Sequence, residues 1–567
     1  MDRITKSLMS DFLKEQSIKS IDDPKDFEKF CNYSIISNEC SDTFDIQDIS
    51  VGGESDTGFD GIAILINGRL IDSVEEVDDI VQLNGYLDAN FVFIQSKTSS
   101  SFDGSDIGDF FYAIGDFFSK TPKLIRNEFV IRKAVITEHI LQMSSKMIRR
   151  SPIIKLCFVT TGKWMNDANL VARIDGEKND LENTNLFSEI IFHPIDASSI
   201  QKLYRSTKEN SIAEINFPNR VTLPDLDDVS QSYLGTIPIS EYLKLITDES
   251  GNIQKSLFYD NIRDFQGDNE VNKEMAETLK GASTKSRKFV ILNNGITVVA
   301  KGITLIGNRM TLRDYQVVNG CQTSHVIYNL RDEIDLTIHV PIRIIATIDE
   351  GTTNIVIKST NRQTEVKTEE LAAMSEFQKK LETFYTTFDE SKRLYYERRS
   401  KQYTGTTGMD KSRIITIPTQ IRVFASMFLD LPYRTVRYYG TLKQMIGNNI
   451  FAENHDTHPY YTSAFAYIRG EYLLKNGQID PKYRRFRYHT LMILRYQLGG
   501  IKAPFFNSGK MSSYCNNILA DLWSDNYLES FEKAIQVIDD LNLTTADDNE
   551  LKTQVFTERI IDHLKRV

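Results

Sequence analysis

The sequence predicts a multidomain α/β protein whose last third is mostly helical. Strand and helix patterns alternate over about the first 200 residues, a second α/β pattern follows, and helical periodicity dominates beyond about Lys367. With 567 residues, the chain is longer than one hydrophobic core usually supports, since domains average roughly 150 residues. Hydrophobic residues make up 41% and charged residues 26%, which are values of a folded globular protein. We therefore expect two to four domains, on the order of length divided by 150.

The first predicted domain covers residues 1–210. A helix carries Phe27, Phe30 and Tyr33 on one face, and a strand over 58–68 ends in an Asn-Gly turn. The pattern then predicts further elements in chain order, namely a strand over 90–98, helices over 109–118 and 131–147, and a buried strand over 154–161. A strand pair followed by a helix and another strand is typical of an α/β unit.

The second α/β region is predicted over residues 233–371, after a linker at 211–232. Pro218 and Pro224 lie in that linker, which has no sustained periodicity. Strands are expected at 288–292, 297–300, 311–318 and 337–346, and helices at 322–331 and 353–359. Residues 372–567 are expected to form the helical region, and no internal repeat is evident.

Cysteine usage and hydropathy exclude several protein classes. The five cysteines are scattered and never occur in a CxxC spacing, so neither a disulfide framework nor a structural zinc site is encoded. The N-terminus lacks an apolar stretch of signal-peptide length, and no window approaches the roughly 20 apolar residues of a membrane span. We expect a cytoplasmic protein with no membrane partner.

Charge is distributed unevenly along the chain. The net charge is −11, but residues 41–110 alone contain fifteen acidic residues against two basic ones, Arg69 and Lys97. The rest of the chain is therefore close to neutral. A uniform negative charge would argue against nucleic-acid binding, whereas this pattern leaves that function open.

Asp60, Gln95 and Lys97 form the first candidate site. Gln95 and Lys97 are two residues apart on one predicted strand, so their side chains share a face, and Ser96 is expected to point away. If the strand ending at Gly68 pairs beside it, Asp60 can meet that face. Metal-dependent phosphodiester cleavage needs a carboxylate that holds Mg²⁺ and a cation that stabilises the negative charge of the transition state. The alternative is that Asp60 is a turn residue and Lys97 a solvated strand end.

Three segments around these residues resemble the PD-(D/E)xK nucleases, especially the Mrr-like restriction branch. They are FEKF at 27–30, GGESDTGFDGIAI at 52–64 and FVFIQSKT at 91–98, with Gln95 in place of the second acid. The resemblance implies a restriction-endonuclease-like core that uses Mg²⁺ or Mn²⁺. It makes Asp60 the central metal ligand, Gln95 a weaker ligand, and Lys97 the residue that positions water and stabilises the transition state.

The same resemblance implies a further ligand, Glu28, from the preceding helix. The alternative is a solvated glutamate on a helix surface. Glu54 and Asp56 lie near enough in the sequence to act as additional ligands.

Four central motifs resemble the abortive-infection phage-resistance family known as AIPR. They occur in order and in register: NIRDFQGDNEVN at 261–272, FVILNNGITVVA at 289–300, YQVVNGCQTSHVI at 315–327 and IVIKSTNRQTEV at 355–366. The chain is similar to that family's full-length form, in which a nuclease-like front end precedes the AIPR region. The resemblance implies a role in bacterial defence with a phage-derived trigger.

The central motifs are rich in amide side chains that can bind a ligand. The segment VVNGCQTSHVI predicts a strand, a glycine turn and a helix whose N-terminal amides could hold a phosphate. Candidate contacts to a nucleotide or nucleic acid are Arg263, Asn294, Asn319, Gln322, Asn361 and Arg362. The alternative is a buried amide network that fixes loop geometry. No GxxxxGK[ST] phosphate loop is present.

Basic and aromatic residues alternate in three C-terminal segments, at 392–403, 434–443 and 482–495. This mixture pairs phosphate neutralisation with base stacking, so Arg398, Arg399, Arg484 and Arg485 are candidate nucleic-acid contacts. The alternative is a helical core with snorkelling arginines.

Two functions follow from the sequence. The first is a Mg²⁺- or Mn²⁺-dependent endonuclease of abortive infection, with DNA favoured over RNA, acting as a homodimer because one active site cuts one strand. The second is a catalytically weak sensor whose AIPR region binds a nucleotide or a phage component.

Overall fold

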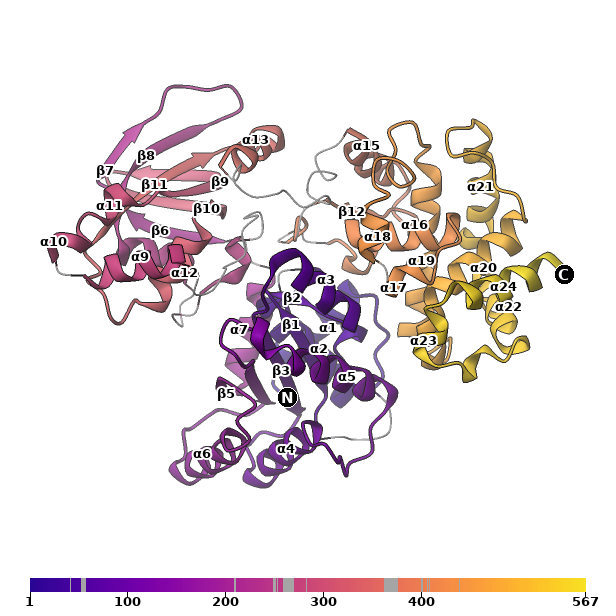
Figure 1. Cartoon of the computed structure of the whole chain (residues 1–567), viewed down its shortest axis with the longest axis horizontal. Coiled ribbons are helices and arrows are strands. Elements are labelled where there is room, and N and C mark those ends of the chain that lie inside the picture. The colour runs from indigo at the N-terminus through magenta and orange to yellow at the C-terminus, as the bar shows by residue number, and fades with distance from the viewer. Residues whose placement is uncertain are drawn as a thin grey trace.

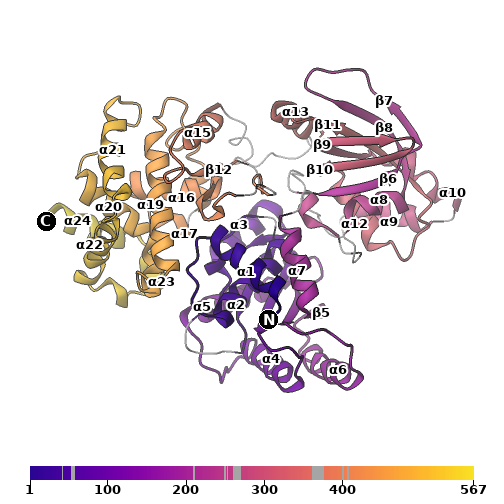
Figure 2. The same ribbon diagram turned by 180° about the vertical axis from the view of Figure 1, so that it is seen from behind.

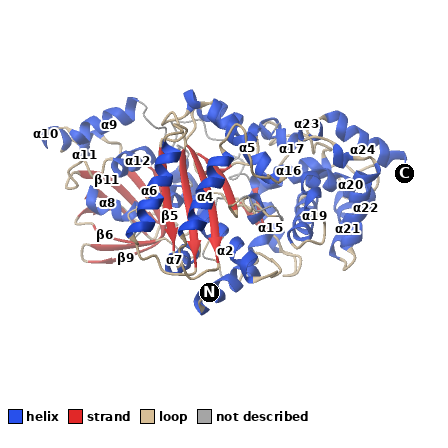
Figure 3. Ribbon diagram, turned by 90° about the horizontal axis from the view of Figure 1, so that it is seen from below, coloured by secondary structure: helices blue, strands red, loops and turns tan. Residues whose placement is uncertain are grey.

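The computed structural model describes the chain except residues 41, 53–57, 209–210, 248–250, 252, 259–269, 282, 361–375, 399–400, 405, 407, 438 and 567. Three parts are visible in Figure 1 and, from behind, in Figure 2. The N-terminal α/β part lies at the bottom, the central part forms one upper flank, and the C-terminal helices form the other. Figure 3 shows strands flanked by helices in the first two parts and mainly helices in the third. The α/β class and the helical C-terminal region are thus confirmed.

The N-terminal sheet has the strand order β2-β1-β3-β4-β5 within the described residues. β1 (Gly61–Ile66) pairs antiparallel with β2 (Arg69–Leu70) and β3 (Ala89–Lys97). β4 (Ile153–Thr160) and β5 (Glu189–Ile195) continue the sheet in parallel. The sheet is therefore mixed, and the meander of antiparallel strands ends at the parallel pair β3 and β4.

Helices cover both faces of this sheet because alternate strand residues point to opposite sides. One face packs on α1 (Arg3–Glu15), α2 (Asp23–Glu39) and α7 (Ala197–Ser206) through a core that includes Ala63, Val92 and Cys157. The other packs on helices at α3 (Val74–Asn84), α4 (Gly104–Phe117), α5 (Glu128–Gln142) and α6 (Ala168–Glu182). Short 3₁₀ helices lie at η1 (Ile46–Asp48) and η2 (Ser144–Lys146).

The central sheet has the order β6-β10-β9-β11-β8-β7 in the described part of the chain. Its strands are β6 (Ile212–Asn216), β7 (Asn219–Thr222), β8 (Gln231–Pro238), β9 (Ile296–Ile306), β10 (Arg309–Asn319) and β11 (His339–Ala346). All pairs are antiparallel except β9 with β11. The larger core lies against helices, α8 (Ile239–Ile246), α9 (Glu270–Lys280) and α12 (Cys321–Asn329), and α13 (Glu350–Thr360) covers part of the other face.

Two sequence expectations differ from this sheet. Residues 211–232, expected as a linker, contribute β6, β7 and the start of β8, with Pro218 at the turn between β6 and β7. Residues 288–292, expected as a strand, contain the short helix α11 (Phe289–Leu292), which follows α10 (Ser283–Ser286). Periodicity cannot separate strand from helix in a short apolar run such as FVIL.

The C-terminal region is a helical assembly around one large aromatic core. Its longer helices are α15 (Glu376–Thr386), α16 (Ile417–Phe428), α19 (His458–Lys475), α20 (Arg487–Gly499), α21 (Lys510–Trp523), α22 (Tyr527–Asp540) and α24 (Gln554–Arg566). Shorter elements connect them: α17 (Arg434–Arg437), α18 (Tyr439–Lys443), α23 (Asp548–Leu551), η5 (Pro481–Phe486), and the strands β12 (Tyr395–Glu397) and β13 (Ile414–Thr416). Of the helices in the described part of the chain, none has both the length and the apolar character that crossing a bilayer requires.

Candidate functional site

Asp60 immediately precedes β1 in the sequence, and in the structure it lies beside the C-terminal end of β3. Its backbone N–H donates to the Ile94 carbonyl at 2.8 Å, which aligns it with Gln95 across the antiparallel pair. The Asp60 carboxylate oxygen Oδ2 accepts from the Gln95 amide Nε2 at 3.1 Å. Asp60 is half-buried and Gln95 is 5% exposed. The structure therefore brings these two predicted site residues into direct contact.

Ser96 also belongs to this cluster, although the strand alternation predicted that it points away. Its backbone N–H donates to Asp60 Oδ2 at 2.6 Å and its hydroxyl at 2.9 Å. Asp60 precedes the regular part of β1, so its carboxylate reaches along the β3 backbone rather than standing on one face of the sheet. Three donors thus converge on one carboxylate oxygen and hold it in a fixed position.

Asn32 on α2 supports Asp60 from behind. Its side-chain Nδ2 donates to the Asp60 carbonyl at 3.1 Å and is 3.3 Å from the Ser50 hydroxyl. Asn32 is fully buried, and a Cβ added to Gly61 would lie 2.5 Å from its Oδ1. Glycine at 61 therefore allows this close approach. One feature of the sequence points to Asn32: it lies one helical turn after Glu28, so both side chains share a face of α2.

Glu28 faces the same region as Asp60. It is half-buried on α2. The thiol of Cys31 is fully buried, and its pKa is raised well above the ordinary value, first by burial and then by the negative charges of Asp60 and Glu28. Both carboxylates therefore act on one buried thiol, so α2 and the start of β1 direct acidic groups toward a common region.

Lys97 ends β3, half-buried and opposite Thr160 of β4. Within the described residues, its ammonium takes part in no hydrogen bond or ion pair.

Asp60 and Gln95 fit a divalent cation as a minimal set of ligands. Carboxylate and amide oxygens suit Mg²⁺, which binds to one or two carboxylates and completes its shell with water and substrate phosphate. No group of three or more His, Cys, Asp or Glu residues suited to a metal occurs among the described residues. Glu54 and Asp56, the additional ligands considered from the sequence, lie outside the described residues.

The central motifs meet where α12 begins. β10 ends at Asn319, Gly320 turns the chain with a φ of +100°, and α12 follows, as the sequence predicted. A Cβ on Gly320 would lie 2.8 Å from the Ile296 side chain, so the turn also requires glycine for space. Among the residues that the structure describes, no side chain caps the N-terminus of α12.

Amide side chains tie this turn to its neighbours. Gln322 accepts from the Asn272 amide at 2.8 Å. Asn293 accepts from the Gly295 backbone N–H at 2.9 Å and donates to Thr323 at 3.0 Å. Asn294 is exposed and Asn319 half-buried. The predicted contacts Arg263, Asn361 and Arg362 lie outside the described residues.

Comparison with known proteins identifies the family. A family model described as "AIPR protein" matches residues 258–542, which is half of the chain. The chain belongs to the AIPR family. No curated protein and no solved structure matches the chain. The AIPR match spans the central motifs and most of the C-terminal helices, and it leaves the Asp60 site outside.

The basic side chains of the AIPR C-terminal region bind partners within the chain. Arg398 is 7% exposed, and its Nε lies 2.6 Å from Glu382. Arg484 pairs with Asp48 at 2.8 Å and also donates to Gln47. Arg485 donates to the Ala546 carbonyl at 2.7 Å. Arg399 lies outside the described residues.

These pairings favour the alternative of arginines that serve the helical core, and nucleic-acid contact at Arg398 and Arg484 stays a prediction. Their guanidinium groups pair with the half-buried carboxylates of Glu382 and Asp48, and the interleaved Tyr396 and Phe486 are core residues. Local composition could not separate a surface patch from a core segment. Arg484 instead joins the acidic N-terminal segment to the AIPR helices.

Proposed function

We propose that this AIPR protein acts in abortive-infection phage defence as a divalent-metal-dependent endonuclease, with DNA favoured over RNA. The observation that carries the proposal is the contact between Asp60 and Gln95 beside Lys97 at the end of β3. The fold around them, a mixed sheet with helices on both faces, is compatible with the PD-(D/E)xK resemblance and supports the proposal.

Each residue has a separate task in this proposal. Asp60 and Gln95 hold Mg²⁺ or Mn²⁺, and Glu28 approaches from α2. A metal held there would supply Lewis-acid chemistry for the attacking water and the phosphate. Lys97 stabilises the negative charge that develops on the phosphate oxygens in the transition state. Ser96 and Asn32 fix the position of Asp60, so that the carboxylate does not need to reorganise during the reaction.

The experiment is a cleavage assay with the purified full-length protein. Single- and double-stranded DNA and RNA are incubated with Mg²⁺, with Mn²⁺ or with a chelator. We expect metal-dependent cleavage that weakens steeply as salt rises, because the substrate is a polyanion. Full cleavage in chelator would refute the metal mechanism.

Lys97→Ala tests the site within the same assay. We expect cleavage to fall by about two orders of magnitude or more with unchanged substrate binding, since removing one group that stabilises the transition state has that effect. Lys146→Ala is the matched control, because Lys146 is exposed at the opposite end of β3. Equal activity of both variants would move the active site elsewhere.

The second candidate is a sensor that binds without cutting. Gln95 stands where the nuclease family has an acid, which weakens metal affinity and favours this alternative. Nucleic-acid binding with no cleavage under any metal condition would support it. A homodimer, proposed for cutting both strands, is measured by light scattering of the same preparation.

A further inference from the structure

Ion pairs join the N-terminal α/β part to the C-terminal helices. Four acids, which we call the acidic strip, lie in α3 and in η1 with its N-cap, and five cations, which we call the basic face, lie in the C-terminal region. The pairs are Asp45 with Lys475 at 3.3 Å, Asp48 with Arg484 at 2.8 Å and with Arg487 at 3.8 Å, Glu75 with Lys552 at 3.1 Å, and Glu76 with Arg422 at 2.5 Å.

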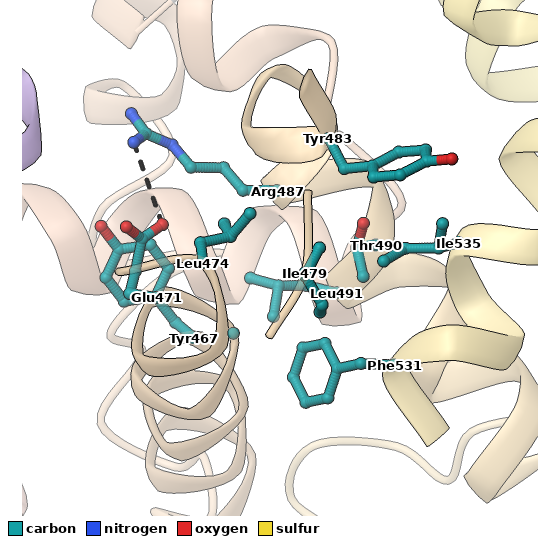
Figure 4. Close-up of a pocket in the computed structure, with 11 residues that line it drawn as sticks. Tyr467, Glu471, Leu474, Ile479, Tyr483, Arg487, Thr490, Leu491, Phe531 and Ile535 are labelled. Carbon is teal, nitrogen blue, oxygen red and sulfur yellow. Dashed lines mark ion pairs between the residues drawn. The ribbon is translucent and has the colours of Figure 1, made fainter. Parts of the chain in front are cut away.

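The two sides nearly match in charge. Five cations face four carboxylates, and Glu471 lies between two of the cations, 3.8 Å from Arg484 and 3.9 Å from Arg487. Figure 4 shows the pair of Arg487 on α20 with Glu471 on α19. The paired side chains of the strip and the face are between 6% and 22% exposed, so water and salt screen these pairs only in part.

Charge, rather than a shared apolar core, joins the two parts. Among the described residues, each hydrophobic core cluster lies wholly within one part, namely within residues 9–204 or within residues 377–560. Opening an apolar interface exposes its surface to water, which is costly. An ionic interface can exchange its carboxylates for other anions, because each cation keeps a partner. The basic face is therefore suited to an anion that competes with the acidic strip.

A nucleic-acid backbone is the anion that fits this face. It presents successive phosphates, to which arginine and lysine bind through charge-assisted hydrogen bonds. Two of the arginines lie over tyrosine rings, Arg422 over Tyr439 at 4.5 Å and Arg487 over Tyr488 at 5.2 Å. Arginines beside aromatic rings are typical of proteins that bind single strands. We propose that the acidic strip occupies a nucleic-acid binding face, and that a single-stranded nucleic acid binds there by displacing the strip.

The acidic strip is continuous with the segment that holds Asp60. Just after Asp48, the Val51 N–H donates to the Asp60 carbonyl, and the Ile49 carbonyl accepts from the Ile62 N–H. Displacement of Asp48 therefore acts on the chain beside the candidate site, so binding at the basic face regulates that site. This regulatory role rests on the proposed nuclease function, whereas the displacement itself does not.

The binding test is fluorescence anisotropy of a labelled single-stranded DNA oligonucleotide with the full-length protein in chelator. Glu76→Gln removes the carboxylate that competes for Arg422, and we expect affinity to rise about fivefold or more. Glu138→Gln, an exposed change on α5, removes the same charge and is the control. Wild-type affinity in Glu76→Gln, or an equal gain in both variants, would overturn the proposal.

A second substitution shows whether the gain depends on Arg422. In Glu76→Gln with Arg422→Gln, we expect the gain to be lost. The slope of log affinity against log salt should become shallower by about one unit than in Glu76→Gln, because one phosphate contact is missing. A gain that persists without Arg422 would refute displacement at this face. If these variants do not fold, Glu75→Gln with and without Lys552→Gln gives the same test at a second pair.

Hydrogen exchange measures displacement directly. Since η1 loses its partners when the strip is displaced, its amides are expected to exchange at least about tenfold faster with the oligonucleotide bound. Unchanged or slower exchange in η1 would contradict the proposal. Poly-glutamate at the same charge concentration is the second probe. Displacement by poly-glutamate but not by the oligonucleotide would assign the basic face to an acidic protein and overturn the choice of nucleic acid.

Regulation is read separately from binding. If the protein cleaves nucleic acid, Glu76→Gln is expected to change the cleavage rate about fivefold or more relative to Glu138→Gln. Equal rates would refute the regulatory role. If the protein does not cleave, the proposed function fails, while anisotropy and hydrogen exchange still decide whether a nucleic acid displaces the acidic strip.

Discussion

At the scale of single residues, the candidate site depends on how tightly Asp60 is held. The carboxylate is fixed by Gln95 and Ser96, and its backbone carbonyl is fixed by Asn32. Asn32 lies so close to Gly61 that no Cβ would fit between them. Glycine at position 61 therefore allows the contact by which Asn32 holds Asp60. The position of Asp60 is thus a property of α2 as well as of the sheet.

Gly61→Ala is predicted to disturb this contact. The new Cβ would lie 2.5 Å from Asn32 Oδ1, and both residues are confined by their neighbours. Overpacking of this kind costs about 1–3 kcal/mol. Urea unfolding measures it. Gly115→Ala is the control, because Gly115 lies on the exposed face of α4 with nothing within 4 Å of a Cβ there, and alanine is expected to stabilise by about 1 kcal/mol. Equal effects would disprove the steric account.

Glu397 is predicted to make stability depend on pH. Burial raises its pKa to about 7, the Thr43 hydrogen bond and Lys401 oppose the rise, and Asp42 adds to it. Since the folded-state pKa lies above the unfolded value, the folded state binds the proton more tightly. Stability is therefore expected to decline as pH rises from about 4.5 to about 7, by on the order of 3 kcal/mol.

Denaturation of Glu397→Gln and wild type across this range tests the expectation. The variant cannot ionise, so it should gain stability relative to wild type as pH rises. The exposed Glu453→Gln provides the comparison. A constant difference between Glu397→Gln and wild type at all pH values would show that Glu397 does not titrate in this window.

At the scale of elements, η5 connects two parts of the chain. Arg484 pairs with Asp48 of η1, and residues 49–51 then pair beside Asp60. Arg484→Ala would leave Asp48 and Glu471 without this cation. We predict a loss of about 3 kcal/mol in urea unfolding, as for other partly buried pairs. Lys482→Ala on the same element should cost well under about 1 kcal/mol, since its pair with Asp480 is exposed. Similar losses would mean that η5 does not join the two parts.

Sequence patterns predicted the helices and strands more accurately than they predicted the side-chain contacts between them. Strands β1, β3 and β4 and helix α12 follow from alternation and periodicity, and antiparallel pairing was enough to place Asp60 beside Gln95. Asn32 and Ser96 were not foreseen, because their roles depend on how far side chains reach between elements. The FVIL helix was mistaken for a strand because a run of four apolar residues has no readable period.

At the scale of the whole molecule, the acidic N-terminal segment has a structural partner. Glu76 lies 2.5 Å from Arg422, Glu75 pairs with Lys552 at 3.1 Å, and Asp45 with Lys475 at 3.3 Å. The acidic excess of residues 41–110 and the basic C-terminal side chains therefore neutralise each other in part. These ion pairs link the acidic segment to the C-terminal helices.

The central claim is that Asp60 holds the catalytic metal, and the most direct test is single-turnover cleavage of DNA at saturating Mg²⁺ by wild type and Asp60→Asn. The substitution keeps the shape of the side chain and removes its charge, and unfolding measurements establish that both proteins are folded. We predict that the variant cleaves at least about a hundredfold more slowly, since loss of a metal's stabilisation is worth several kcal/mol. A rate within about twofold of wild type would contradict the account.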